Sequence, residues 1–168
     1  MAHVFLSLGS NLGDRLLYLR RAIIALSNLP SCHILKVSPV YETEPVSSIS
    51  QPSFLNLVLA FETGTQPLCL LSAVKAIEVS VGRTASPHWG PREIDIDILL
   101  YDDLVVTTEV LSIPHPEMHR RRFVLVPLAD IAPDIVHPML RLPVRELLLQ
   151  CEDKHWVRPF VASLAPFV

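Results

Sequence analysis

The chain has 168 residues, half of them hydrophobic and 18% charged, with a formal net charge of −3. This length suits one domain over residues 1–168, and the composition excludes a disordered chain. The negative charge argues against a general nucleic-acid-binding protein, because such proteins present basic surfaces to the phosphates.

In chain order, apolar residues recur at the spacing of strands or of helices. These patterns predict a strand over 3–8, a helix from the N-cap Asp14 to Leu26, strands over 33–43 and 54–62, a helix from Pro67 to Val81, a strand over 94–101, and helices over 118–131 and 144–151. The order β-α-β-β-α-β predicts an α+β fold, a ferredoxin-like α/β sandwich with an antiparallel sheet and extra C-terminal elements.

No apolar run reaches membrane-spanning length, because Asp102 and Asp103 interrupt the apolar strand before them. The N-terminus lacks a basic region, so we expect no signal peptide. Cys32, Cys69 and Cys151 are widely separated and lack metal-site spacing, as is typical of proteins in a reducing compartment. We therefore expect a cytoplasmic protein with neither a membrane nor a nucleic acid as partner.

The strand that begins at Ile94 carries two acids on one face. Asp95 and Asp97 alternate with isoleucines, which places their Cα atoms about 6.5–7 Å apart on the same side. A solvated strand face would explain an arbitrary pair of this kind. However, like charges repel and aspartate disfavours strands. The alternative is a pair of Mg²⁺ ligands, since Mg²⁺ is usually held by one or two carboxylates together with substrate phosphates.

The predicted sheet has a second face with aromatic and amide side chains. Phe54 and Asn56 could form an aromatic plate beside an amide, which suits a planar heterocycle with hydrogen-bonding edges. Alternatively, Phe54 packs under the loop over 44–52, and Asn56 satisfies backbone groups there. From these residues alone, the structural alternative is the stronger one.

Three arginines near predicted loop ends are candidate phosphate ligands, because guanidinium groups match phosphate oxygens in a bidentate way. Arg83, Arg92 and Arg121 would each, if alone, be interpreted as surface charges. Together with the acid pair, they favour chemistry on a triphosphate with Mg²⁺. The glycines at 9 and 13 match neither the P-loop nor the dinucleotide-binding pattern.

Several short motifs occur in one order along the chain. They are Leu8–Asp14, Gln51–Asn56, Gly82–Arg83, Trp89–Ile98, Ile113–Met118 and Arg121–Leu128. In these motifs, over roughly residues 3–150, the chain resembles the 6-hydroxymethyl-7,8-dihydropterin pyrophosphokinase family of folate biosynthesis. The run from Trp89 to Asp97, with its W-G-P-R and I-D-I-D segments, is the most specific of them.

The resemblance implies a transferase that moves pyrophosphate from ATP to the pterin hydroxymethyl group and releases AMP. It implies Mg²⁺, as two ions, held by Asp95 and Asp97, and ATP as co-substrate. The implied catalytic residues are Arg83, Arg92 and Asp97. The implied ATP-binding residues are Lys75, Glu78, Trp89, Arg92, Ile98, Ser112, His115 and Arg121. The implied pterin-binding residues are Thr43, Val46, Phe54, Asn56, Trp89 and Phe123.

The chain departs from the family pattern around the nucleotide. The loop between Arg83 and Trp89 is one residue shorter than in the best-known members, and His88 stands where they often carry arginine. Val110 and Pro116 replace a cationic and an aromatic nucleotide contact. The expected partners are small-molecule substrates only, and the expected state is a monomer.

Two other functions are compatible with parts of the pattern. Another two-metal nucleotide transferase on the same sandwich would not need Phe54, Asn56 and Phe123 together. A ferredoxin-like RNA-binding or dimerisation module would need exposed aromatics and a basic surface. The acid pair and the net negative charge argue against such a module.

Overall fold

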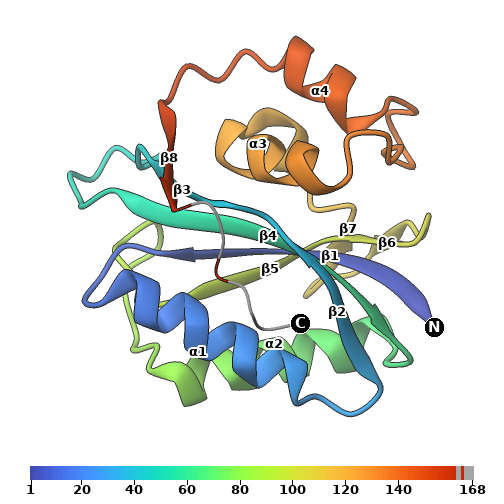
Figure 1. Ribbon diagram of the computed structural model, residues 1–168, viewed down its shortest axis with the longest axis horizontal. Helices are drawn as coiled ribbons and strands as arrows, with labels where there is room; N and C mark the ends of the chain where they lie inside the picture. The colour runs from blue at the N-terminus through green and yellow to red at the C-terminus, as the bar shows by residue number, and fades with distance from the viewer. Residues whose placement is uncertain (162–163, 165–168) are drawn as a thin grey trace.

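The central sheet is antiparallel and has helices on both faces (Figure 1). A computed structural model describes residues 1–161 and 164. The strands of the main sheet are β1 (Ala2–Ser10), β2 (Cys32–Val37), β3 (Val40–Thr43), β4 (Phe54–Thr63), β5 (Asp95–Tyr101) and β8 (Val157–Val161), and β6 (Val106–Thr107) pairs with β7 (Ser112–Ile113). The helices are α1 (Arg15–Ser27), α2 (Pro67–Val81), α3 (Arg122–Ile131), α4 (Val144–Gln150) and the short 3₁₀ helix η1 (Met118–Arg120).

The sheet runs in the order β5-β1-β4-β3-β8, and β2 also pairs with β4. The predicted strand over 33–43 is therefore two strands on one edge of β4, so that prediction was wrong in its continuity. The break falls at Pro39, which cannot donate to a ladder. Ser38 bridges it, since its N–H donates to Val58 O and its Oγ accepts from Val58 N, both at 2.9 Å. The predicted ferredoxin-like α+β sandwich is confirmed, with its second strand in two pieces.

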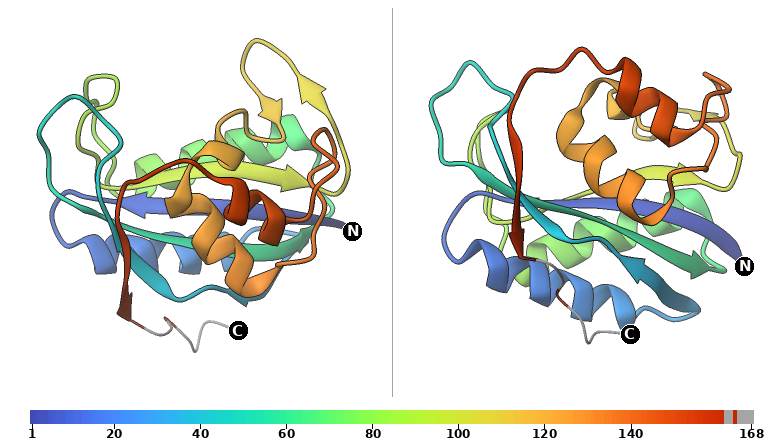
Figure 2. Two further views of the ribbon diagram at one scale, coloured as in Figure 1. Left: turned by 90° about the horizontal axis from the view of Figure 1, so that it is seen from above. Right: turned by 45° about the horizontal axis from the view of Figure 1, so that its top comes forward.

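Two apolar cores lie on opposite faces of the sheet. The first includes Leu55, Leu57, Leu59 and Phe61 of β4, which share one face as the alternation predicts, and it packs under α1 and α2. The second includes Val58 and is closed by α3 and α4. We expected the second face to carry polar and aromatic residues. However, α3 and α4 cover much of it, as Figure 2 shows, so the candidate site is limited to the rest.

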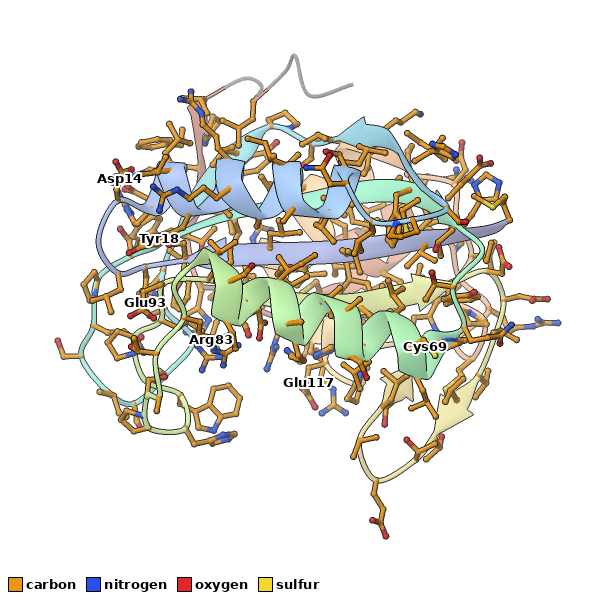
Figure 3. The ribbon with its side chains drawn as sticks, turned by 90° about the horizontal axis from the view of Figure 1, so that it is seen from below. Asp14, Tyr18, Cys69, Arg83, Glu93 and Glu117 are labelled. Carbon is orange, nitrogen blue, oxygen red and sulfur yellow. The ribbon has the colours of Figure 1, made fainter. Side chains whose placement is uncertain are left out.

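The start of α1 and the end of α2 both lie against the ring of Tyr18. Asp14 caps α1 as predicted, because its carboxylate accepts a hydrogen bond from Leu17 N at 3.0 Å. Gly13 and Gly82 both have positive φ, 68° and 129°, and a Cβ on either would lie 3.1 or 3.2 Å from the Tyr18 ring. Gly82 therefore ends α2 directly under this ring and sets the start of the next loop (Figure 3).

The C-terminal third differs from the predicted elements in two places. The helix expected over 118–131 is divided at Arg121, whose φ of −120° is extended. Strand β8 was not predicted at all. Within the described residues, no helix combines the length and the apolar character that crossing a membrane requires.

We expect Leu59→Ala to reduce the free energy of unfolding by about 2–5 kcal/mol, because this β4 side chain is fully buried and its truncation leaves a cavity. Leu149→Ala is the matched control, since Leu149 is 78% exposed and should lose less than about 0.5 kcal/mol. Urea unfolding of both variants measures the difference. Equal losses would contradict the assignment of this core.

Candidate active site

A cavity of about 350 Å³ opens over the uncovered part of the sheet. Its walls come from β1, β3, β4 and β5, from α2 and the start of α3, and from the loops over 44–53 and 82–94. The predicted pterin residues all line it: Thr43, Val46, Phe54, Asn56, Trp89 and Phe123. The structure therefore brings together side chains that are up to 80 residues apart in the sequence.

The floor of this cavity is built by a close approach of β1 and β4. Gly9 pairs with Asn56, and a Cβ on Gly9 would lie 2.5 Å from Asn56 Oδ1, so only glycine fits. Asn56 is buried, and its Nδ2 donates to Thr43 Oγ1 at 2.6 Å. The amide is therefore held in one orientation at the bottom of the cavity.

The two acids of β5 have different surroundings. Asp95 forms ion pairs with Arg83 at 2.9 Å and Arg92 at 3.1 Å. In the part of the chain that the structure describes, the Asp97 carboxylate has no hydrogen-bond or ion-pair partner. Burial, and then the neighbouring charge of Asp95, raise the pKa of Asp97 to about 6, against the opposing effect of Lys75. Asp97 thus offers oxygen atoms that the protein itself leaves free.

Glu78 organises the cations beside these acids. It is 2% exposed, and its carboxylate contacts Arg83 Nη1 at 2.7 Å and Lys75 Nζ at 3.0 Å, and accepts from Ile96 N at 2.7 Å. Burial lowers the pKa of Arg83, but the charges of Glu78 and Asp95 outweigh this and raise it, so Arg83 stays charged. Figure 3 shows Arg83 at the C-terminal end of α2, where the loop toward Glu93 begins.

A second cavity, of about 270 Å³, lies next to the first. Its lining includes four predicted ATP-binding residues, Lys75, Ile98, Ser112 and His115, and also Val110 and Pro116 of the departures noted above. Lys75 and Asp97 line both cavities. The two cavities therefore meet at one cation and one unpaired carboxylate.

Asn11 joins the two loops around the first cavity. Its Nδ2 donates to Gln51 Oε1 at 2.9 Å and to Pro52 O at 3.0 Å, and its Oδ1 accepts from Arg92 N at 2.9 Å. Gln51 Nε2 in turn donates to Trp89 O at 2.8 Å. One buried amide thus fixes the end of one loop and the end of the other.

Arg121 lies between the two aromatic rings on the cavity wall. Its guanidinium carbon is 5.7 Å from the ring centroid of Trp89 and 5.7 Å from that of Phe123. Both contacts are within the range of cation–π attraction. This brings a cation to the aromatic side of the cavity.

The acid pair suits a hard cation such as Mg²⁺. The described residues contain no group of three or more histidine, cysteine or acidic side chains that could hold a metal alone. Two carboxylates on one strand face, one of them without a protein partner, match a metal that takes its other ligands from phosphates and water. The residues present therefore fit Mg²⁺ bound together with a nucleotide.

Comparison with known proteins agrees with this geometry. Residues 5–133 match the family described as 7,8-dihydro-6-hydroxymethylpterin-pyrophosphokinase. The chain belongs to this pyrophosphokinase family. A relative from Aquifex aeolicus, named 2-amino-4-hydroxy-6-hydroxymethyldihydropteridine pyrophosphokinase, is 43% identical over 164 residues, covering 98% of this chain and 99% of that protein. A protein of the same name from Pseudomonas aeruginosa is 42% identical, with 88% and 91% covered.

Solved structures support the fold of this family member. A crystal structure of Plasmodium falciparum HPPK-DHPS with pterin and p-hydroxybenzoate superposes with a TM-score of 0.71 over 89% of this chain, at 20% identity. This chain spans only 41% of that longer chain. The family is therefore a transferase family with a ferredoxin-like α+β fold, and ATP is its co-substrate.

The predicted nucleotide residues of this pyrophosphokinase divide into three groups. Lys75, Ile98, Ser112 and His115 line the second cavity, and Trp89, Arg92 and Arg121 line the first. Glu78 lines neither cavity, because its carboxylate is turned inward to Arg83 and Lys75. The structure thus gives Glu78 a place behind the cations and not on the cavity surface.

Sequence reasoning missed several residues of this family site. Ser7, Gly9 and Gln51 line the first cavity, and Asn11 holds its loops. Glu93 lies before β5 and accepts hydrogen bonds from Thr84 N at 3.2 Å and Thr84 Oγ1 at 2.7 Å. Gly9, Asn11 and Gln51 lie inside the family motifs named above, so those motifs could have indicated that they belong to the site. Nothing local pointed to the bond between Glu93 and Thr84.

His115 of this pyrophosphokinase is held in its neutral form. Burial, and then the charge of Arg121, lower its pKa to about 4. Its Nδ1 accepts a hydrogen bond from Glu117 N at 3.2 Å, which requires an unprotonated nitrogen. Its backbone N–H donates to Leu99 O at 2.9 Å, which ties the segment to β5.

The lowered pKa of His115 predicts acid sensitivity. Because the unfolded chain binds this proton near pH 6.5 and the folded chain only near pH 4, stability should fall as the pH drops through this window. We expect His115→Asn to reduce this acid-induced loss in the free energy of unfolding by roughly 1–3 kcal/mol. Urea unfolding between pH 7 and pH 4 measures it. His33→Asn, on an exposed side chain, should keep the wild-type profile, and an unchanged profile in His115→Asn would show that other groups dominate.

Proposed function

We propose that this chain transfers pyrophosphate from ATP to 6-hydroxymethyl-7,8-dihydropterin in folate biosynthesis, with the pterin in the first cavity and the nucleoside in the second. The observation that carries this arrangement is that Lys75 and Asp97 line both cavities. A phosphate chain that runs from one cavity to the other passes these two residues. The family match supports the reaction, and the two residues shared by the cavities support its location between them.

The first cavity has the chemistry that a pterin needs. Phe54 and Phe123 offer rings for stacking, and the oriented amide of Asn56, beside Thr43, offers hydrogen bonds to the heterocycle edge. Main-chain groups near Thr43 and Val46 complete this edge in our proposal. Trp89 closes the cavity from the second loop.

For the nucleotide, Ile98, Ser112 and His115 form the second cavity, and Lys75 points to the phosphates. Arg92, Arg121 and Trp89 lie on the side of the first cavity and receive the far end of the phosphate chain. In this scheme, Glu78 acts through Arg83 and Lys75. It is a positioning residue, because it fixes the direction of Arg83 and Lys75.

Asp95 and Asp97 would hold Mg²⁺, as two ions, together with phosphate oxygens. When bound, Mg²⁺ would neutralise phosphate charge. The free carboxylate of Asp97 is the more available ligand, since Asp95 already balances Arg83 and Arg92. Burial, and then the repulsion between the two acids, raise the pKa of Asp97, and a bound cation would oppose both effects.

Phosphoryl-type transfer needs positioning and charge stabilisation more than covalent help from the protein. In the proposed step, the pterin hydroxyl gives up its proton to solvent as its oxygen bonds to the β-phosphorus, while the bond from the β-phosphorus to the α–β bridging oxygen breaks, and AMP leaves. Arg83 and Arg92 are placed to stabilise the negative charge that develops. The two loops, joined through Asn11 and Gln51, limit the access of water.

We further propose that the chain works as a monomer in the cytoplasm, with small molecules as its only partners. Cys32, Cys69 and Cys151 are free thiols, which supports a reducing compartment.

The decisive test is to incubate the protein with ATP, Mg²⁺ and the hydroxymethyl pterin and to measure AMP. Asp97→Ala should lower this rate by about a thousandfold or more, because a metal ligand is lost at the reacting phosphates. Asp103→Ala, at an exposed acid outside both cavities, is the matched control and should remain active. Wild-type AMP formation by Asp97→Ala at low Mg²⁺ would show that the metal assignment is wrong.

Phe123→Ala should weaken pterin binding by about 1–3 kcal/mol, since one face of the stacked ring loses its partner. ATP binding should change little, because Phe123 does not line the second cavity. Calorimetric titration with each ligand separates the two effects. Equal losses for both ligands would indicate a general folding defect and not a stacking contact.

A further inference from the structure

The C-terminal segment over 152–161 lies outside residues 5–133 that match the family, yet it contacts Glu44, which lines the first cavity. After α4 it crosses over the sheet and ends as β8, the edge strand beside β3 (Figures 1 and 2). Its contacts fall at two places, the start of α3 and the base of the loop over 44–53.

At α3 the contact is a buried carboxylate. Asp153 Oδ2 accepts a hydrogen bond from Arg122 N at 2.9 Å, and its Oδ1 accepts one from His155 N at 3.0 Å. The side chain is 7% exposed, and although burial opposes its ionisation, these two bonds lower the pKa of Asp153. Arg122 is the first residue of α3 and directly precedes Phe123. Asp153 therefore fixes the helix start that carries one proposed pterin wall.

At the loop the contact is a pair of reciprocal hydrogen bonds. Glu44 N donates to Trp156 O at 3.0 Å, and Trp156 N donates to Glu44 Oε2 at 3.0 Å. These bonds extend the ladder between β3 and β8, in which Thr43 pairs with Val157. Glu44 lines the first cavity and is the first residue of the loop. The segment thus holds the beginning of the loop.

The end of the same loop is held through Arg158. This side chain pairs with Glu42, which also pairs with Arg15 at 3.2 Å. Arg15 Nη1 donates to Ser53 O at 3.0 Å and to Ser53 Oγ at 3.1 Å. Since Ser53 ends the loop, one chain of charges connects the C-terminal segment to that end as well.

We propose that Asp153, Trp156 and Arg158 are positioning residues for the pterin, which they orient through α3 and through both ends of the loop over 44–53. A loop and a helix start that are fixed in advance lose less entropy when the ligand binds. None of these contacts involves a residue that lines the second cavity in the described part of the chain. The effect should therefore be larger for the pterin than for the nucleotide. The inference rests on the proposed location of the pterin in the first cavity.

The test measures ligand affinities of full-length variants by calorimetry. The pterin is titrated with and without Mg²⁺ and a non-hydrolysable ATP analogue, and the analogue is titrated alone. Asp153→Ala and Arg158→Ala should each weaken pterin binding by about three- to tenfold and weaken binding of the analogue clearly less. Hydrogen exchange of the amides over 44–53 should be faster in Arg158→Ala, and that of the first turn of α3 faster in Asp153→Ala.

Two controls separate positioning from a folding defect. Asp153→Asn keeps an oxygen that accepts from Arg122 N, so it should recover most of the pterin affinity. Arg145→Ala removes another exposed ion pair, to Asp134 near α4, and should leave pterin affinity unchanged. Unchanged pterin affinity in both Asp153→Ala and Arg158→Ala would overturn the inference, as would equal losses for both ligands. Phe123→Ala tests the pterin location separately, because full pterin affinity in that variant would contradict the proposed function itself.

Discussion

Two like charges on one half-buried strand face are the constraint around which this site is built. Asp95 and Asp97 repel each other, and among the described residues only Asp95 has ion-pair partners. Arg83 and Arg92 pair with Asp95, and Arg83 is held in turn by Glu78. The result is an alternating series of acids and bases, Glu78, Arg83, Asp95 and Arg92, and beside it Asp97 lies where the two cavities meet. Excess negative charge at that point favours a divalent cation, and the surplus of cations around it favours a phosphate chain.

The rest of the fold keeps these charges in place. Gly82 ends α2 under the Tyr18 ring, so that Arg83 leaves the helix toward Asp95. Gly9 lets β1 approach β4 closely enough for the Asn56 amide to form the cavity floor. Gly9 and Gly82 each set the position of a polar group of the site. The site therefore draws on strands, helices and loops from nearly the whole chain.

Much of the fold and the acid pair could be predicted from the sequence, because they follow local periodicity. The alternation in β5 predicts that Asp95 and Asp97 share a face, and the cap at Asp14 follows from its position before a helical pattern. The burial of Glu78 could not be predicted, since its partners come from its own helix, the next loop and β5. Strand β8 was not predicted from the sequence for a related reason. With Pro159 at its centre and mostly exposed side chains, it has little strand character of its own and exists through its pairing with β3.

The carbonyl group of Trp89 has a wider consequence. It accepts from Gln51 Nε2 at 2.8 Å and from Ser47 Oγ at 3.3 Å, so the loop over 44–53 and the loop over 82–94 share one acceptor. If either loop opens, the other loses its partner, and the two segments behave as one thermodynamic unit. A ligand that orders one loop therefore reduces the conformational entropy that is lost when the other loop becomes ordered. By linkage, the gain is reciprocal: whichever substrate binds first, it raises the affinity for the second by the same factor.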